Sequence, residues 1–328
     1  MAISQDLVGS FPWAKAPARL ERAPLRALRV RRAGPSGHGK RGIGLALIGV
    51  VLASSCSHPN RVIVGAKNFT ESDLLAEIAA QQIERRTGLT VERKLHLGGT
   101  FVCHSAITAG QIDLYVEYTG TAYTAVLKHA AGPGADSVRQ AVAQEYRQRW
   151  NLVWLDPYGF NNTFAIAVRQ ADAERLGLHT ISDLARIGSQ WHAGFGYEFL
   201  NRADGFPGLA TAYGLHFAAP PTAMDLGLTY RALAEGKIDV IAGNSTDGQL
   251  AALHLVALVD DRHYFPPYEA APVVRNAVLE QHPEVGRALL ELRGKIDDDE
   301  MRRLNAMADI EHKDLHAIAH DWLARAVP

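Results

Sequence analysis

The chain has 328 residues, of which 47% are hydrophobic and 21% are charged, so it is long enough for one large or two medium domains with a sizeable core. Its formal net charge of −1 gives no overall field for attracting nucleic acid or an anionic membrane, and no nucleic-acid partner is expected. The two cysteines, Cys56 and Cys103, are too few for a disulfide framework and form no Cys-x-x-Cys motif. Cys103 is therefore predicted to be a buried apolar residue.

Residues 1–56 have the organisation of a secretory signal peptide. Basic residues between Arg22 and Arg41 precede the apolar run "GIGLALIGVVLASSC", which is too short to span a bilayer comfortably. The small residues before Cys56 resemble a bacterial lipobox, although Ala53 stands where leucine is usual. We expect export to the periplasm or another extracytoplasmic space, a lipid anchor on Cys56 and a tether over residues 57–60. Simple cleavage and a translation start downstream of Met1 stay open as alternatives.

Predicted strands and helices alternate from residue 61 onward. Periodicity predicts a helix over 71–88 with Leu74, Leu75 and Ile78 on one face and Gly88 as its end. The expected order is a strand at 61–69, this helix, a strand at 89–97, a "GGT" loop at 98–100, a helix at 101–110 and a strand at 111–118. Such alternation is typical of an α/β fold with a parallel or mixed sheet. The glycine loop lacks the spacing and lysine of a nucleotide-binding loop and is expected to donate backbone N–H groups near a cleft.

A segment of this pattern occurs again later in the chain. Residues 107–120 read "ITAGQIDLYVEYTG" and residues 233–246 read "LAEGKIDVIAGNST". Both contain Gly-x-Ile-Asp, then an apolar strand, then a polar end, which predicts two related α/β lobes. In this register Tyr118 corresponds to Asn244 and Thr119 to Ser245. Because ligands of open α/β sheets bind at strand ends, these residues are candidates for the two walls of one site.

Several further motifs are similar to those of a known family. The segments "VGAKNFTES", "DPYGFNNTFAIAV", "NSTDGQL" and "LVDDRHYFPPYEAAPVVR", together with the first repeat, resemble the osmoprotectant-binding proteins of ABC transporters, the glycine betaine, choline and carnitine receptors of the ProX-like type. The resemblance covers residues 61 to about 325. It implies a two-lobed periplasmic-binding-protein fold, type II-like, with lobe one at 61–160 and 266–328 and lobe two at 161–265. It also implies hinge closure on a small ligand and delivery to a membrane permease.

The resemblance implies site residues as well. A trimethylammonium group donates no hydrogen bond and is held by aromatic faces, each contributing roughly 0.5–2 kcal/mol. Tyr118 and Tyr268 stand where similar proteins have cage tyrosines, while Lys67, Thr121 and Arg202 match positions on the side of the ligand carboxylate.

Two cage positions depart from the family pattern. Phe164 replaces a usual tyrosine but keeps a ring face, whereas Asn244 replaces another and has no ring. The sequence therefore leaves open a weak betaine receptor or a receptor for a different zwitterion or amine with a donor for Asn244. The nearby tyrosines Tyr123, Tyr197 and Tyr230 are candidates for the missing ring, but no motif places any of them at that position.

Other classes of function stay open as alternatives. A periplasmic enzyme on the same scaffold is disfavoured because no nucleophile–base pair can be assembled from the motifs, and the sequence does not separate a permease receptor from a sensor. His312, His316 and His320 have the spacing of one helical face, but no complementary acidic or cysteine ligand is identifiable from the sequence. We therefore expect neither a metal site nor a cofactor.

Overall fold

The computed structural model describes residues 60–130 and 134–328, which form two five-stranded mixed sheets. The expected signal peptide, Cys56 and residues 57–59 of the expected tether lie outside this part. The first sheet has the order β2 (Thr90–Lys94), β1 (Arg61–Gly65), β3 (Leu114–Tyr118), β10 (Ala270–Arg275) and β4 (Leu152–Trp154). The second has the order β7 (Thr222–Met224), β6 (Ala193–Gly196), β8 (Val240–Asn244), β5 (Phe164–Arg169) and β9 (Leu255–Ala257). We call the elements around the first sheet lobe one and those around the second lobe two.

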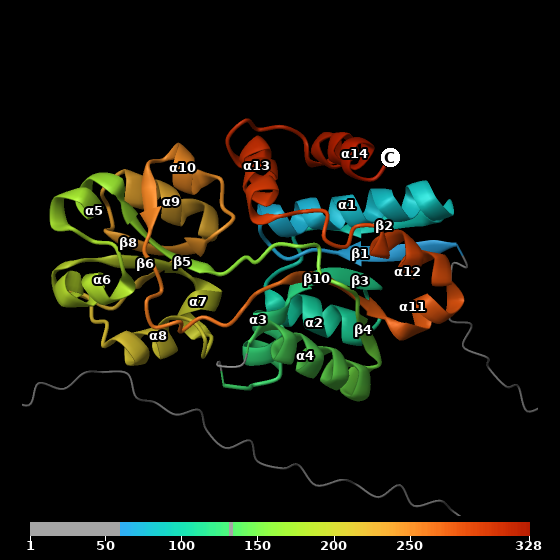
Figure 1. Cartoon of the computed structure of the whole chain (residues 1–328), viewed down its shortest axis with the longest axis horizontal. Helices are drawn as coiled ribbons and strands as arrows, with labels where there is room; N and C mark the ends of the chain where they lie inside the picture. The colour runs from blue at the N-terminus through green and yellow to red at the C-terminus, as the bar shows by residue number, and fades with distance from the viewer. Residues whose placement is uncertain (1–59, 131–133) are drawn as a thin grey trace, which may run out of the picture. The chain divides into compact units, whose positions relative to one another are not determined.

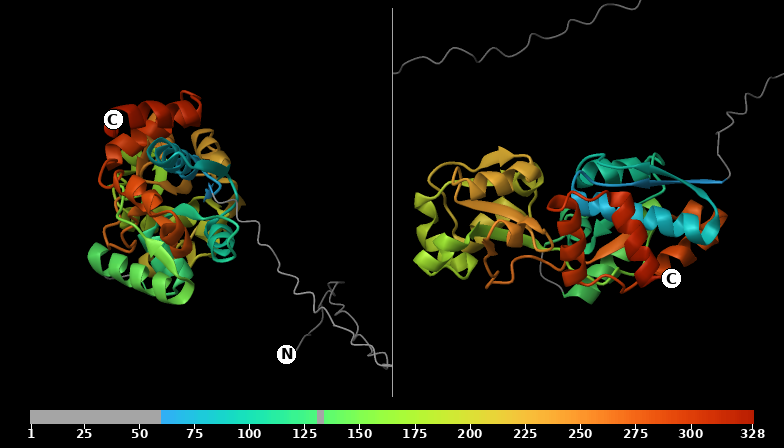
Figure 2. Two further views of the ribbon diagram at one scale, coloured as in Figure 1. Left: turned by 90° about the vertical axis from the view of Figure 1, so that its right-hand side faces the viewer. Right: turned by 90° about the horizontal axis from the view of Figure 1, so that it is seen from above.

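Lobe one carries helices on both faces of its sheet (Figure 1; Figure 2). Alternation of side chains along each strand divides its apolar residues between two cores, so that Val62 and Val64 of β1 pack on one face and Ile63 on the other. The helices of this lobe are α1 (Thr70–Thr87), α2 (Thr100–Thr108), α3 (Thr119–Thr121), the π-helical turn η1 (Ala122–Val126), α4 (Ala135–Trp150), α11 (Asn276–Gln281), α12 (Pro283–Leu290), α13 (Asp298–Asp309) and α14 (Leu315–Ala326). Figure 1 shows α1 and α14 above the first sheet and α2 and α4 below it.

Lobe two is built in the same way around its own sheet. Its helices are α5 (Gln170–Leu176), α6 (Ile181–Ile187), the 3-10 turn η2 (Gly188–Gln190), α7 (Tyr197–Asn201), α8 (Phe206–Tyr213), α9 (Leu226–Ala234) and α10 (Gln249–Ala252). Ile166 and Val168 of β5 pack with the core of α6 and α8, whereas Ala167 packs with α9. In the described residues, no helix has the length and apolar character needed to cross a membrane.

The sequence repeat corresponds to equivalent positions in the two sheets. β3 lies between β1 and β10 in the first sheet, and β8 lies between β6 and β5 in the second. In each case the strand is parallel to one neighbour and antiparallel to the other. Tyr118 and Asn244 are the last residues of these strands, so the prediction of two related α/β lobes is confirmed.

Two chain segments connect the lobes, the first between β4 and β5 (155–163) and the second between β9 and β10 (258–269), and they pair with each other. Asn161 and Glu269 form an isolated antiparallel bridge, and the Asn161 side chain accepts a hydrogen bond from the Tyr268 N–H at 2.6 Å. The Asn162 N–H donates to the Tyr268 carbonyl at 3.0 Å. These contacts fix the start of β10, and with it Tyr268, beside the first connection.

The local predictions for the first segment agree with the structure. The predicted helix at 71–88 is α1, and Gly88 ends it in the left-handed region with a φ of 71°. Cys103 is fully buried, as predicted. The expectation that His312, His316 and His320 share one helical face is wrong for His312. The Asp314 side chain accepts a hydrogen bond from the Ala317 N–H at 3.0 Å and caps α14, so the helix begins after His312.

Candidate functional site

A cavity of about 290 Å³ lies between the two lobes and is lined by elements of both. β3, α2 and the loop after β1 contribute from lobe one, and β8, β5 and α7 contribute from lobe two. The seven residues predicted from the sequence all line it, namely Lys67, Tyr118, Thr121, Phe164, Arg202, Asn244 and Tyr268. The structure therefore brings the predicted residues to one place, and their contact with a ligand stays a prediction.

Aromatic rings from both lobes and from the second connection meet in the cavity wall. The Phe164 ring lies 5.7 Å from the Tyr268 ring between centroids, in an edge-to-face arrangement. The Phe199 ring lies 4.8 Å from the Phe164 ring and the Phe69 ring lies 6.3 Å from the Tyr118 ring, again between centroids. Phe69 and Phe199 line the cavity too, so the apolar wall contains more rings than the predicted set.

The side chain of Tyr118 is fixed by a hydrogen bond to a buried glutamate, Glu71. Its hydroxyl donates to Glu71 at 2.6 Å, and Asn162 and Asn305 each donate to the same carboxylate at 2.8 Å. Thr246 of lobe two supplies a fourth donor. Burial raises the pKa of Glu71 above its ordinary value, although these four hydrogen bonds act in the opposite direction. Glu71 thus positions the Tyr118 ring and joins segments of both lobes.

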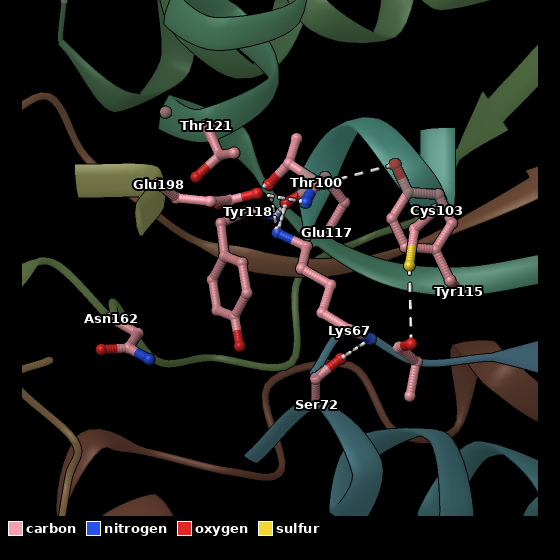
Figure 3. Close-up of polar contacts among 12 residues, drawn as sticks. Lys67, Ser72, Thr100, Cys103, Tyr115, Glu117, Tyr118, Thr121, Asn162 and Glu198 are labelled. Carbon is pink, nitrogen blue, oxygen red and sulfur yellow. Dashed lines mark hydrogen bonds and ion pairs between the residues drawn. The ribbon is translucent and has the colours of Figure 1, made fainter. Parts of the chain in front are cut away.

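Lys67 is buried, and its charge is compensated inside the protein. Its Nζ pairs with Glu117, whose side chain is fully buried, and donates to the Thr100 hydroxyl at 3.2 Å. The same Nζ lies 4.9 Å from the centroid of the Tyr118 ring (Figure 3). Lys67 therefore approaches the site as half of a buried ion pair rather than as a free cation.

Arg202 is also paired with a buried carboxylate. It donates to both oxygens of Asp204, to Thr121 at 3.3 Å, and stacks 5.2 Å above the Phe164 ring. The Tyr268 hydroxyl donates to Asp204 at 2.8 Å. Burial acts to raise the pKa of Asp204, but the hydrogen bonds and charge of Arg202 outweigh it, and that pKa lies below its usual range. Burial, followed by the Asp204 charge, holds the pKa of Tyr268 well above its usual range.

Asn244 lies at the end of β8 opposite Phe164 of β5. Its side-chain nitrogen donates to Asp247 at 3.1 Å, and its backbone N–H donates to the same carboxylate at 2.9 Å. Asn244 also borders a second cavity of about 200 Å³, whose lining includes the carboxylates of Asp73, Asp225, Asp247 and Asp309 together with that of Glu71.

Sequence reasoning missed several residues of the cavity wall. Asn162, Glu198 and Asp225 line it, although none was a candidate. The only sequence signal for Glu198 is its spacing from Arg202. In "EFLNR" it precedes Arg202 by four residues, about one helical turn. Among the extra tyrosines, Tyr197 borders this cavity, whereas Tyr230 borders the second one.

Comparison with known proteins shows similarities that extend over most of the chain. Residues 60–325 match the family described as the substrate binding domain of ABC-type glycine betaine transport system. The chain is 34% identical over 290 residues to the carnitine transport binding protein OpuCC of Listeria monocytogenes, covering 86% of this chain and 94% of that protein. It is 35% identical over 293 residues to a glycine-betaine-binding protein of Pseudomonas aeruginosa, covering 86% and 93% respectively.

Two solved structures give the same result for the fold. The crystal structure of a glycine betaine/carnitine/choline ABC transporter matches with a TM-score of 0.68 and 34% sequence identity, covering 80% of this chain and 98% of that one. Apo YehZ from Escherichia coli matches with a TM-score of 0.61 and 33% identity, covering 81% of this chain and 98% of that one.

Proposed function

The chain belongs to the family of substrate-binding domains of ABC-type glycine betaine transport systems, and we propose that it binds a quaternary ammonium compound between Tyr118, Phe164 and Tyr268. It has the two-lobed fold of periplasmic-binding proteins and is the solute receptor of an ABC importer, whose permease receives the solute. The family is one of transport proteins, so we propose that the site binds its solute without changing it chemically.

The observation that carries the proposed ligand is the gathering of aromatic rings at one cavity. A quaternary ammonium group has no N–H to donate, so it is held by the negative faces of rings. Tyr118 comes from β3, Phe164 from β5 and Tyr268 from the second connection, yet all three line the same space. Two of these rings already attract cations of the protein itself, Lys67 over Tyr118 and Arg202 over Phe164.

We propose that closure of the lobes completes this cage. The rings of Tyr118 and Phe164 belong to different lobes, so neither lobe alone presents the full wall. We place lobe one at 61–160 and 266–328 and lobe two at 161–265, with the paired connections around Asn161 and Glu269 as the hinge. A ligand that contacts both walls favours the closed form, and the permease would then recognise that form.

The proposed cage is tested by replacing its rings. Tyr118 and Tyr268 are buried and donate to Glu71 and Asp204, so truncation to alanine would disturb the fold along with the site. The double variant Tyr118→Leu/Tyr268→Leu is instead compared with Tyr118→Phe/Tyr268→Phe. Both pairs lose the hydroxyls, and only the leucine pair loses the ring faces.

Calorimetric titration with choline and glycine betaine is the measurement. We expect the leucine pair to bind about tenfold to a hundredfold more weakly than the phenylalanine pair, which corresponds to the loss of two cation–π contacts. Equal affinities of the two double variants would refute the cage.

We propose further that the protein is exported and anchored by a lipid on Cys56. The basic segment, the short apolar run and the small residues before Cys56 support this proposal.

A further inference from the structure

Carboxylates outnumber cations around the main cavity. The two cations that line it, Lys67 and Arg202, are paired with the buried carboxylates of Glu117 and Asp204. Two more carboxylates, those of Glu198 and Asp225, line the cavity itself. Within the described part of the chain, the charge at this site therefore favours a positively charged ligand over a zwitterion.

The Glu198 carboxylate already occupies the groups that would bind a carboxylate of the ligand. One Glu198 oxygen accepts from the Thr100 N–H at 2.5 Å (Figure 3). The other accepts from the Thr100 hydroxyl at 3.3 Å and lies 3.6 Å from the Arg202 guanidinium. Thr100 is the first residue of α2, and the first N–H groups of a helix lack partners within it and attract negative charge. Gly99 makes the approach possible, because a Cβ there would lie 2.0 Å from a Glu198 oxygen.

Asn244 offers a second acceptor at the same cavity. Its side-chain nitrogen donates to Asp247 at 3.1 Å, and within the described residues its side-chain carbonyl oxygen accepts no hydrogen bond, so this oxygen can accept one from a ligand. Glu198 and Asn244 together can accept hydrogen bonds from a ligand hydroxyl or amine.

We propose that Glu198 determines specificity by excluding a free carboxylate, so that the solute is a quaternary ammonium cation with a hydroxyl or another hydrogen-bond donor. This inference rests on the proposed function and defines its ligand class. For a ligand carboxylate, the Thr100 N–H at the start of α2 is already hydrogen-bonded, and Lys67 and Arg202 are already paired with buried carboxylates. The ligand carboxylate would also lie close to the Glu198 charge in a partly water-excluded cavity. A hydroxyl in the same place instead donates to Glu198.

Choline and glycine betaine test this proposal, because both carry a trimethylammonium group and they differ in hydroxyl against carboxylate. The purified protein is titrated calorimetrically with each, as wild type, Glu198→Gln and Asp225→Asn. Asp225→Asn is the matched control, since it also converts a carboxylate of the cavity wall into an amide, and asparagine retains the acceptor that caps α9 at the Gly227 N–H.

We expect wild type to bind choline about tenfold or more tightly than glycine betaine. Glu198→Gln should reduce this ratio by about tenfold or more, because glycine betaine no longer meets a like charge and the choline hydroxyl donates to a neutral amide oxygen instead of a carboxylate. Asp225→Asn should reduce the ratio clearly less than Glu198→Gln, because Asp225 contributes charge to the cavity but, among the described residues, makes no hydrogen bond to Thr100 and no ion pair with Arg202. Thermal unfolding without ligand checks that each variant is folded, and Glu198→Ala is a second variant that should reduce the ratio in the same direction.

Three results would overturn the inference. Wild-type protein that binds glycine betaine more tightly than choline would contradict it while leaving the proposed function standing. An unchanged ratio in Glu198→Gln and Glu198→Ala, or an equal shift in Asp225→Asn, would remove the specific role of Glu198. Binding of neither compound by wild type would overturn the proposed function and this inference with it.

Discussion

At the scale of single residues, the carboxylate of Asp247 links the second cavity to the end of β8. It accepts hydrogen bonds from the Tyr230 hydroxyl, from the Asn244 N–H at 2.9 Å and from the Asn244 side chain. Burial raises the pKa of Asp247 to about 7, because these donors do not fully replace the water that an ionised carboxylate loses. The aspartate therefore titrates near neutral pH in the folded protein.

This shift predicts a dependence of stability on pH. The pKa in the folded state is higher than the unfolded value of 3.8, so the unfolded chain releases its proton first as the pH rises. The free energy of unfolding should fall between about pH 4 and pH 7 and then level off, with at most about 4 kcal/mol from this residue. Denaturant unfolding at pH 4, 5.5 and 7 should show a smaller fall for Asp247→Asn than for wild type. The same fall in both proteins would contradict the prediction.

At the scale of elements, the turn after β3 is packed tightly against the second connection between the lobes. The Thr119 N–H donates to the Glu269 carbonyl at 3.0 Å, and the Thr119 hydroxyl donates to the Pro267 carbonyl at 3.2 Å. A Cβ on Gly120 would lie 2.6 Å from the Pro267 carbonyl oxygen and 2.8 Å from the Tyr268 ring. The absence of a side chain at Gly120 is therefore what lets the Tyr268 ring approach β3.

Gly120→Ala should consequently displace Tyr268 and weaken the cage. We expect a loss of about 1–3 kcal/mol in the free energy of unfolding and a lower affinity for choline. Thermal unfolding and calorimetric titration measure the two effects. Gly134→Ala is the control, because a Cβ at that helix-capping glycine meets none of the described residues within 4 Å and its φ of −64° suits alanine. Equal behaviour of the two variants would show that the close packing at Gly120 has no role in the site.

At the scale of the whole molecule, the proposed lipid anchor is on a residue outside the described part. Cys56 ends the small-residue segment after the apolar run, and Cys103 is the chain's other cysteine. Cys103 is fully buried in lobe one, and burial raises its thiol pKa to about 12, which leaves it unreactive at neutral pH. The two cysteines therefore form a natural pair of test and control.

Cys56→Ser should release the protein from the membrane fraction into the soluble fraction of cells that express the full chain. Mass spectrometry should at the same time show loss of the lipid, because serine has no thiol to carry it. Cys103→Ser should remain in the membrane fraction with its lipid. Retention of the Cys56→Ser protein in the membrane fraction would refute the anchor.

Much of the architecture follows from the sequence. The alternation of strands and helices, Gly88 as the end of α1 and the correspondence of Tyr118 with Asn244 are all readable, because periodicity and glycine conformation are local properties. The family resemblance supplied Tyr118, Phe164, Tyr268 and the other predicted residues, which the two lobes bring to one cavity.

Only the tertiary structure decided how the charges at the site are arranged. Lys67 pairs with Glu117, fifty residues away, and Glu198 reaches Thr100 across the cavity, ninety-eight residues away. Glu71 likewise gathers donors from β3, the first connection, lobe two and α13. Periodicity reports which face of an element is buried but not which distant side chain it meets there, so partners of buried charges are set by how the sheets and connections pack together.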